Sequence, residues 1–222
     1  MGLSKKTMNL VSINVSQPRE IAYNQKTLKT GIFKEPVFGR VQLRSLGLDG
    51  DGQADLKNHG GVNRAVYVYT IENYEYWKKE LERDYFPYGQ FGENFTVEGM
   101  LEDQIHIGDV FRIGGTLMEV TQPRVPCFKL GMKMNLDQFP KLFLASGRIG
   151  FYLRVLKEGE VKAGDRIHRV KIDPSRMTVH EVSHLLHFGT KNIDEARRAL
   201  SVQALSPGWR ESFEKIIASS GV

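Results

Sequence analysis

Apolar and polar residues alternate in short runs, separated by glycines, from residue 9 to residue 172. Alternation of this kind is typical of strands with one buried face, so this part of the chain predicts a β-rich domain. The clearest strand candidates are residues 10–15, 41–43, 65–69, 110–113, 117–120, 151–156 and 167–172. A Gly-Asp step precedes two of them, at Gly108-Asp109 and at Gly164-Asp165, and suggests two similar turns that close a barrel.

Helical spacing interrupts the strands. Directly after Thr70, a suitable N-cap, apolar residues recur three or four positions apart, at Ile71, Tyr74, Trp77 and Leu81. We interpret this aromatic stripe as the core-facing side of a helix. A second short helix is expected over residues 136–145, although Pro140 disfavours a helix interior.

The pattern changes after Pro174 to helices with clear start signals. These signals are Thr178 with Glu181, Asn192 with Glu195, and Ser206 with Pro207. Gly189 suits the end of the first helix. The last helix has an apolar face made by Trp209, Phe213, Ile216 and Ile217. The sequence therefore predicts a β domain over residues 1–172 and a three-helix subdomain over residues 177–222.

Composition places the chain among ordinary globular proteins, since 41% of its 222 residues are hydrophobic and 26% are charged. A chain of that length can bury a core without disulfides, and its single cysteine excludes an intrachain one. A lone thiol fits a reducing compartment, and no apolar run is long enough for a signal peptide or a spanning helix. We therefore expect a cytoplasmic protein with no membrane partner. The net charge of +5 favours an anionic partner, although a merely basic soluble surface explains it equally well.

Two motifs resemble metal sites. Residues 180–184, His-Glu-Val-Ser-His, match the zinc-protease pattern H-E-x-x-H, and His187 adds a third histidine. Because Glu181 is already used in a capping box, we favour a structural helix whose histidines face solvent. The alternative is a zinc site completed by a distant glutamate. Residues 49–55 resemble a calcium loop, but its sixth position lacks glycine and its twelfth lacks glutamate.

The segment from Gln122 to Leu130 holds the only cysteine in a chemically distinctive setting. Two prolines fix the backbone, so the residues between them should form a stiff, non-helical loop at the end of a strand. Arg124 and Lys129 flank Cys127 with positive charge, which favours the thiolate, the form that binds metals. We interpret this cysteine as functional; the alternative is an inert, buried thiol.

Paired glycines mark a second distinctive segment, from Asp55 to Arg64. Gly60 and Gly61 allow close approach of the backbone to a ligand, and their N–H groups can hold an anion. Further donors and positive charge beside them come from Lys57, His59 and Arg64. Taken alone, the segment would be interpreted as a polar turn before a strand. A third glycine-centred polar loop covers residues 91–95.

Together these segments resemble MOSC-domain proteins, and among them the bacterial YiiM-type branch. The resemblance rests on residues 55–61 (Asp-Leu-Lys-Asn-His-Gly-Gly), Phe91-Gly92-Glu93-Asn94, Gly108-Asp109 and the cysteine segment, in that order. The tail resembles the C-terminal 3-alpha domain of the same branch. The resemblance implies a mainly β fold with α, a pseudo-barrel of mostly antiparallel strands plus three helices. It also implies binding of the molybdenum cofactor in its molybdopterin form.

In the proteins that the chain resembles, the matching cysteine binds molybdenum, which implies Cys127 as the metal ligand. The remaining cofactor contacts are then expected from Lys57, His59, Gly60, Gly61, Arg64, Asn94, Gln122, Arg124 and Lys129. The resemblance further implies an oxidoreductase that reduces N-hydroxylated compounds, such as hydroxylaminopurine bases, to amines. Cys127 and His59 are the expected catalytic residues, His59 as a proton donor, because imidazole titrates near neutrality.

Electrons should come from another protein, since the sequence carries no flavin or nicotinamide signature, and we expect a flavoprotein reductase that docks on the helical tail. A second hypothesis is a carrier in which Cys127 holds a persulfide, or passes the cofactor to a client enzyme, without turnover. A third, nucleic-acid binding by the tail, is less favoured, because the basic residues of the tail are balanced by acidic ones.

Overall fold

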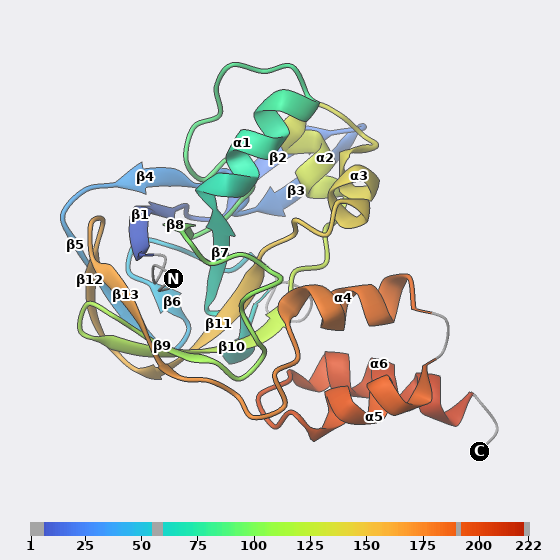
Figure 1. The fold of residues 1–222 in the computed structure, drawn as a ribbon. Coiled ribbons are helices and arrows are strands. Elements are labelled where there is room, and N and C mark those ends of the chain that lie inside the picture. Colours follow the sequence, from blue (N-terminus) through green and yellow to red (C-terminus); the bar gives the residue numbers. More distant parts are fainter. Residues whose placement is uncertain (1–6, 55–59, 190–191, 220–222) are drawn as a thin grey trace.

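The computed structural model describes residues 7–54, 60–189 and 192–219, and Figure 1 shows how their elements are arranged. The strands are β1 (Met8–Val15), β2 (Arg19–Tyr23), β3 (Lys26–Thr30), β4 (Glu35–Val37), β5 (Arg40–Arg44), β6 (Gly47–Leu48), β7 (Val66–Thr70), β8 (Phe95–Glu98), β9 (Val110–Ile113), β10 (Thr116–Pro123), β11 (Phe151–Lys157), β12 (Gly159–Lys162) and β13 (Arg166–Lys171). The helices are η1 (Val62–Arg64), a 3-10 turn, and α1 (Ile71–Glu80), α2 (Phe128–Met134), α3 (Phe139–Ala145), α4 (Val179–His187), α5 (Ile193–Ser201) and α6 (Pro207–Ala218).

A closed sheet forms the body of the protein. Its strands follow the order β13-β9-β10-β11-β7-β8-β1-β4, and β1 also pairs with β13, which closes the first seven strands into a barrel. Met8 and Asn9 of β1 pair with β13, whereas Ile13 to Val15 pair with β4. Every pairing is antiparallel except that of β7 with β8. The predicted pseudo-barrel of mostly antiparallel strands is therefore confirmed.

One hydrophobic core runs from the barrel into the C-terminal helices. Phe95, Phe111 and Phe151 from the strands and Val182 and Phe213 from the helices belong to the same buried cluster. A second, largely aromatic cluster lies between the barrel and helices α1 and α3; it contains Tyr69, Trp77, Phe91, Phe139 and Phe143. In Figure 1 the α1–α3 side and the α4–α6 side cover different faces of the barrel.

The helices confirm most of the start signals. The Thr70 hydroxyl accepts a hydrogen bond from the Asn73 N–H at the start of α1, and Thr178 forms both bonds of the capping box with Glu181. Asn192 caps α5 as expected. Ser206 stands at the N-cap of α6, but its hydroxyl makes no capping bond. Among the helices of the described residues, none is both long and apolar enough to cross a membrane.

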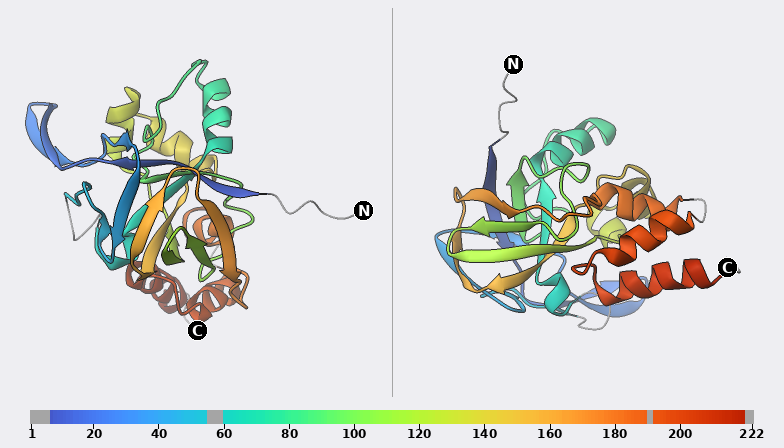
Figure 2. Two further views of the ribbon diagram at one scale, coloured as in Figure 1. Left: turned by 90° about the vertical axis from the view of Figure 1, so that its left-hand side faces the viewer. Right: turned by 60° about the horizontal axis from the view of Figure 1, so that its bottom comes forward.

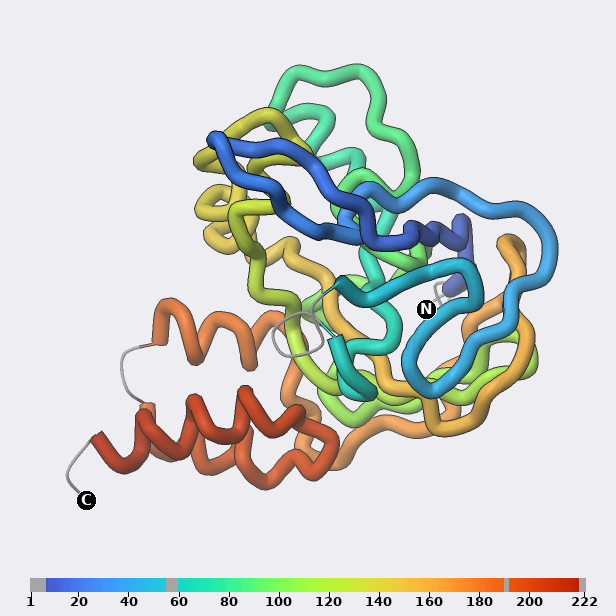
Figure 3. The backbone as a smooth tube through the Cα atoms, turned by 180° about the vertical axis from the view of Figure 1, so that it is seen from behind, coloured from blue at the N-terminus to red at the C-terminus, as the bar shows by residue number. Residues whose placement is uncertain are grey.

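Two short sheets complete the fold. Strands β2 and β3 form a hairpin that projects from the barrel in the left view of Figure 2 and approaches α2 in Figure 3, where Tyr23 stacks on Phe128 with 6.0 Å between ring centroids. Strands β12, β5 and β6 form a three-stranded sheet. The hairpin was not predicted, because its strands carry mostly exposed side chains, some of them charged, and bury almost nothing.

Candidate functional site

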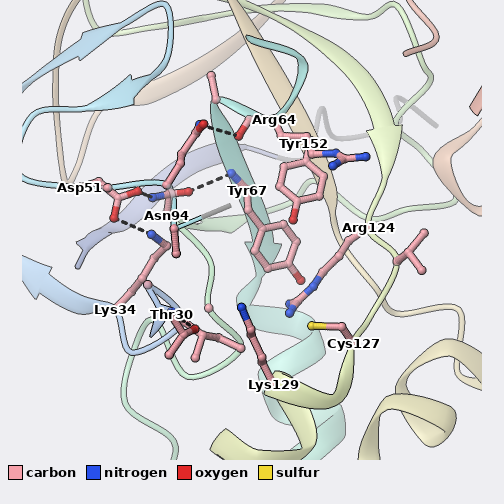
Figure 4. Close-up of a pocket in the computed structure, with 18 residues that line it drawn as sticks. Thr30, Lys34, Asp51, Arg64, Tyr67, Asn94, Arg124, Cys127, Lys129 and Tyr152 are labelled. Carbon is pink, nitrogen blue, oxygen red and sulfur yellow. Dashed lines mark hydrogen bonds and ion pairs between the residues drawn. The ribbon is translucent and has the colours of Figure 1, made fainter. Parts of the chain in front are cut away.

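A cavity of about 110 Å³ opens beside the only cysteine (Figure 4). Segments distant in the sequence line it: Thr30, Gly31, Ile32, Lys34, Asp51, Gly52, Gln53, Ala54, Arg64, Ala65, Tyr67, Gly92, Asn94, Arg124, Val125, Cys127, Lys129 and Tyr152. A single water needs only about 10–15 Å³ of such space, so the cavity is much larger than the site of one water.

Cys127 is held between a strand and a helix. Strand β10 ends at Pro123, and Cys127 is the N-cap of α2 with an extended backbone, at φ −128° and ψ 171°. The expected non-helical loop between the prolines is confirmed. The helix that starts directly after Cys127 was not predicted. The thiol is half-buried and lines the cavity, so it is not the inert, buried thiol of the alternative interpretation.

Arg124 brings a buried positive charge to the cysteine. Its side chain is 6% exposed, donates to the Phe91 carbonyl, and lies with its guanidinium carbon 4.4 Å from the centre of the Tyr67 ring. Burial opposes the charge, but Tyr67, Tyr152 and Cys127 around it raise the pKa of Arg124 overall, so the guanidinium stays charged. A fixed cation beside a thiol favours the thiolate.

Tyr67 and Tyr152 form a neutral aromatic wall, with their ring centroids 5.3 Å apart. The Tyr67 hydroxyl donates to the Ile149 carbonyl over 2.9 Å. Burial raises the pKa of both phenols above the ordinary value, although the charge of Arg124 opposes this shift. Both hydroxyls therefore remain protonated at neutral pH.

A polar network holds the other side of the cavity. Lys34 and Asp51 form an ion pair of 2.5 Å, and burial lowers the pKa of Lys34 while the charge of Asp51 opposes that shift. The Asn94 amide donates to Asp51 over 2.8 Å, and its oxygen accepts from the Tyr67 backbone N–H over 3.1 Å. Asn94 thus ties β7 to the loop that carries Asp51.

The Phe91–Asn94 turn beneath this network depends on Glu93, which is fully buried. Its carboxylate accepts from the Gly89 N–H (2.9 Å), the Phe91 N–H (3.1 Å) and the Thr96 hydroxyl (2.8 Å), and from the Tyr74 hydroxyl. Gly92 has φ +80°, and a Cβ there would come within 2.8 Å of the Ile32 side chain. The turn therefore needs glycine at this position.

Several predicted site residues meet at the cavity and others do not. Arg64, Asn94, Arg124, Cys127 and Lys129 line it. The Lys129 ammonium also donates to the Lys29 carbonyl over 3.2 Å.

Gln122 does not line the cavity but accepts a hydrogen bond from Arg64 Nε over 3.3 Å. Gly60 and Gly61 are not among the lining residues, and the Gly61 N–H donates to Gln53 over 2.7 Å. Lys57 and His59 lie outside the described residues.

The lining residues that sequence reasoning missed include four whose side chains are important for the chemistry of the site: Lys34, Asp51, Tyr67 and Tyr152. Asp51 belongs to the calcium-like segment, which carries no other recognisable motif. Its partner Lys34 stands 17 positions earlier, in a stretch without a recognisable motif. The tyrosines lie on strands, where aromatic residues usually indicate a core. Only the closed barrel brings these four residues together.

The chemistry of the site fits the molybdenum cofactor. Cys127 offers a soft sulfur donor, and the described lining residues carry four cations (Lys34, Arg64, Arg124 and Lys129) against one carboxylate (Asp51), an excess that suits a phosphate-bearing group. Within the described residues there is no group of three or more His, Cys, Asp or Glu side chains placed to hold a metal ion. A metal at Cys127 therefore needs further ligands from a bound group or from the residues not described.

The histidine-rich helix α4 is built as a structural helix. Glu181 forms its capping box, and His180 and His184 are exposed, as predicted. His187 differs from the prediction: it is half-buried, and its ring meets Trp209 edge-on with 6.0 Å between centroids. Burial lowers the pKa of His187.

Comparisons with known proteins agree with this architecture. A family model described as MOSC domain matches residues 55–168, and a model described as YiiM-like, 3-alpha helix domain matches residues 177–219. MOSC domains are associated with molybdenum cofactor binding.

Individual relatives cover nearly the whole chain. It is 38% identical to the uncharacterized protein YflK of Bacillus subtilis over 96% of both chains, and 35% identical to protein YiiM of Escherichia coli over 84% of both. A protein of Gibberella moniliformis named as a reductase is 33% identical over 72% of this chain, but over only 29% of its own length. The crystal structure of YiiM from Geobacillus stearothermophilus superposes with a TM-score of 0.81 and 32% identity, covering 95% of this chain and 99% of that one.

Proposed function

Because the chain belongs to the MOSC domain family and carries a YiiM-like 3-alpha helix domain, we propose that it binds the molybdenum cofactor through Cys127 and reduces N-hydroxylated compounds to amines. The observation that carries the proposal is the position of Cys127, half-buried at a cavity with an excess of cations. A thiolate in that setting is both a metal ligand and the counter-charge of Arg124.

The residues that line the cavity have different roles in the proposed function. Cys127 holds the metal, while Arg64 and Lys129 attract the phosphate-bearing part of the cofactor by charge. Tyr67 and Tyr152 stay neutral and exclude water from the inner wall. When bound, the cofactor supplies the redox chemistry of N–O cleavage.

The overall reaction balances without a nucleotide. The N–OH group takes up two electrons and two protons, the N–O bond breaks, and the oxygen leaves as water. A flavoprotein reductase is the proposed electron donor. The fungal relative named as a reductase supports a redox role, and more than two thirds of that protein lies outside the match. His59 remains the proposed proton donor.

The test is turnover by the full chain made in a host that synthesises the cofactor. We expect the purified protein to contain molybdenum and, with an artificial electron donor, to convert hydroxylaminopurine to the amine. Cys127→Ala should lose both the metal and the activity, because the protein then offers no thiolate ligand. Undiminished turnover in Cys127→Ala, or no amine from the wild-type protein, would contradict the proposal.

A matched pair of lysines tests the charge of the cavity. Lys129 lines it, whereas Lys141 is exposed on α3. Lys129→Gln should retain about three- to tenfold less molybdenum during dialysis, since a charge-assisted hydrogen bond is lost. Lys141→Gln should retain as much as the wild-type protein.

The partial exposure of Cys127 also favours the second hypothesis, a sulfur or cofactor carrier. Mass spectrometry of the purified protein separates the two. A sulfur adduct on Cys127 without molybdenum, together with no turnover, would support the carrier over the reductase.

A further inference from the structure

The first turn of α6 packs against the end of β10, the strand that leads to Cys127. The Ser206 N–H donates to the Thr121 carbonyl over 3.2 Å, and the Thr121 hydroxyl donates to the Asn63 carbonyl over 2.7 Å. Asn63 belongs to η1, the turn that ends at Arg64. Strand β10 therefore connects the helical subdomain on one side with η1 on the other.

Gln122 continues this connection with its side chain, which is 2% exposed. In the amide orientation that satisfies both of its atoms, Nε2 donates to the Ser206 hydroxyl over 2.8 Å. Its oxygen accepts from the Trp209 indole N–H over 3.2 Å and from Arg64 Nε over 3.3 Å. Ser206 and Trp209 are themselves 3% and 4% exposed. The two residues of α6 thus hold the Gln122 side chain in place beside Arg64 Nε.

This contact explains the unusual N-cap of α6. Ser206 stands in the capping position, yet its hydroxyl makes no bond to the helix backbone. The hydroxyl instead accepts from Gln122, at the cost of an N-cap bond that is usually worth about 1 kcal/mol of stability.

Arg64 links this connection to the cavity, because it contacts Gln122 and also lines the cavity. Its positive charge, like that of Arg124, acts on Tyr152 and lowers the pKa of that phenol against the larger effect of burial. We propose that Gln122, Ser206 and Trp209 are positioning residues, through which the three-helix subdomain orients Arg64 toward the anion held at the Cys127 cavity. The inference rests on the proposed function only in that the cavity binds an anion.

The physical reason is the flexibility of arginine. A guanidinium binds phosphate best when its planar fork is already oriented, and a bond to Nε fixes the plane of the fork. Without the amide oxygen, Arg64 keeps its charge and its other contacts but loses the bond to Nε that helps to fix the plane of the fork. The helical subdomain is therefore part of the anion site, although α6 itself does not line the cavity.

The test uses the full chain without cofactor and inorganic phosphate as the probe. The two tryptophans give separate indole N–H resonances in a ¹⁵N spectrum, and Trp77→Phe assigns them. Trp77 donates to the Tyr69 hydroxyl in the second core cluster, away from the proposed connection. We expect phosphate to shift the Trp209 resonance and to leave the Trp77 resonance in place.

Substitutions then test the connection from α6 through Gln122 to Arg64. Gln122→Met keeps the size of the side chain but cannot accept from Arg64, so phosphate should bind about three- to tenfold more weakly and the Trp209 resonance should no longer respond. Trp209→Phe should weaken binding less, because Ser206 still orients the amide. Gln104→Met, at an exposed glutamine, should change neither measurement.

The outcomes are distinguishable. Phosphate binding that leaves the Trp209 resonance unmoved, or full affinity in a folded Gln122→Met protein, would overturn the inference alone. No phosphate binding by the wild-type chain would overturn this inference, whereas the reductase proposal would still be decided by its own turnover test.

Discussion

Three ionisable side chains show how the barrel accommodates buried charge. Glu93, Glu102 and Arg124 are 0%, 4% and 6% exposed. Each has hydrogen-bond partners, as buried charges require. Glu93 and Arg124 shape the cavity, whereas Glu102 lies elsewhere and titrates near neutrality.

The surroundings of Glu102 explain its titration. Burial raises the pKa of its carboxyl group to about 7, against hydrogen bonds from the Gly150 N–H (2.8 Å) and the Asn73 amide (2.7 Å), which lower it. The folded protein therefore binds a proton at this residue more tightly than the unfolded chain does, whose carboxyl has an ordinary pKa near 4.5.

This difference predicts a pH-dependent stability. The contribution of protonated Glu102 is complete below about pH 4.5 and is lost as the pH rises through about 7, by up to about 3 kcal/mol. In Glu102→Gln this contribution no longer titrates. We expect urea unfolding at about pH 5 and about pH 8 to show a smaller difference in Glu102→Gln than in the wild-type protein. Equal differences in both proteins would contradict the assignment.

At the scale of elements, α4 depends on its N-terminal cap. The Thr178 hydroxyl accepts from the Glu181 N–H over 3.0 Å, and the Glu181 carboxylate accepts from the Thr178 N–H over 2.8 Å. This pair leaves Glu181 a structural role in place of the catalytic one that the H-E-x-x-H pattern suggests.

Substitution of the cap should follow from these two bonds. Thr178→Ala removes one of them and should lower the free energy of unfolding by about 1 kcal/mol. Glu181→Gln keeps an acceptor for the other bond and should stay within about 0.5 kcal/mol of the wild-type protein. Chemical denaturation measures both. A larger loss in Glu181→Gln than in Thr178→Ala would show that the charge of Glu181 has another role.

Local signals predicted some elements well and others not at all. All seven strand candidates and the helix after Thr70 are present. Alternation, helical spacing and caps depend only on residues that are close together in the sequence. The expected helix over residues 136–145 begins at Phe139, since Pro140 is tolerated only in a first turn. Of the residues that line the cavity, the motifs had named five, among them Cys127 and Arg124. Lys34 and Tyr152 join it only through sheet closure.

At the scale of the molecule, the shared core couples the helices to the barrel. Phe213 of α6 is fully buried in the cluster that also contains Phe111 of β9. The barrel and the three helices should therefore unfold together.

Each part contains one tryptophan, so this cooperativity can be measured. In Trp77→Phe the fluorescence reports on Trp209 in α6, and in Trp209→Phe it reports on Trp77 in α1. In each variant, the unfolding transition measured by fluorescence should coincide with the transition measured by circular dichroism. Phe213→Ala should destabilise the whole chain by about 3–5 kcal/mol. A fluorescence transition of Trp209 that precedes the loss of strand structure would refute a common unfolding unit.

The pairing of Met8 with Ile167 has a consequence for synthesis of the protein. Strand β1, which precedes the other barrel strands in the sequence, finds this partner only when β13 has emerged from the ribosome, because a contact between distant residues must wait for the chain between them. Until then the thiol of Cys127, already translated, lies in an open nascent sheet. A cofactor that needs the closed barrel can therefore be loaded only after β13 has been made.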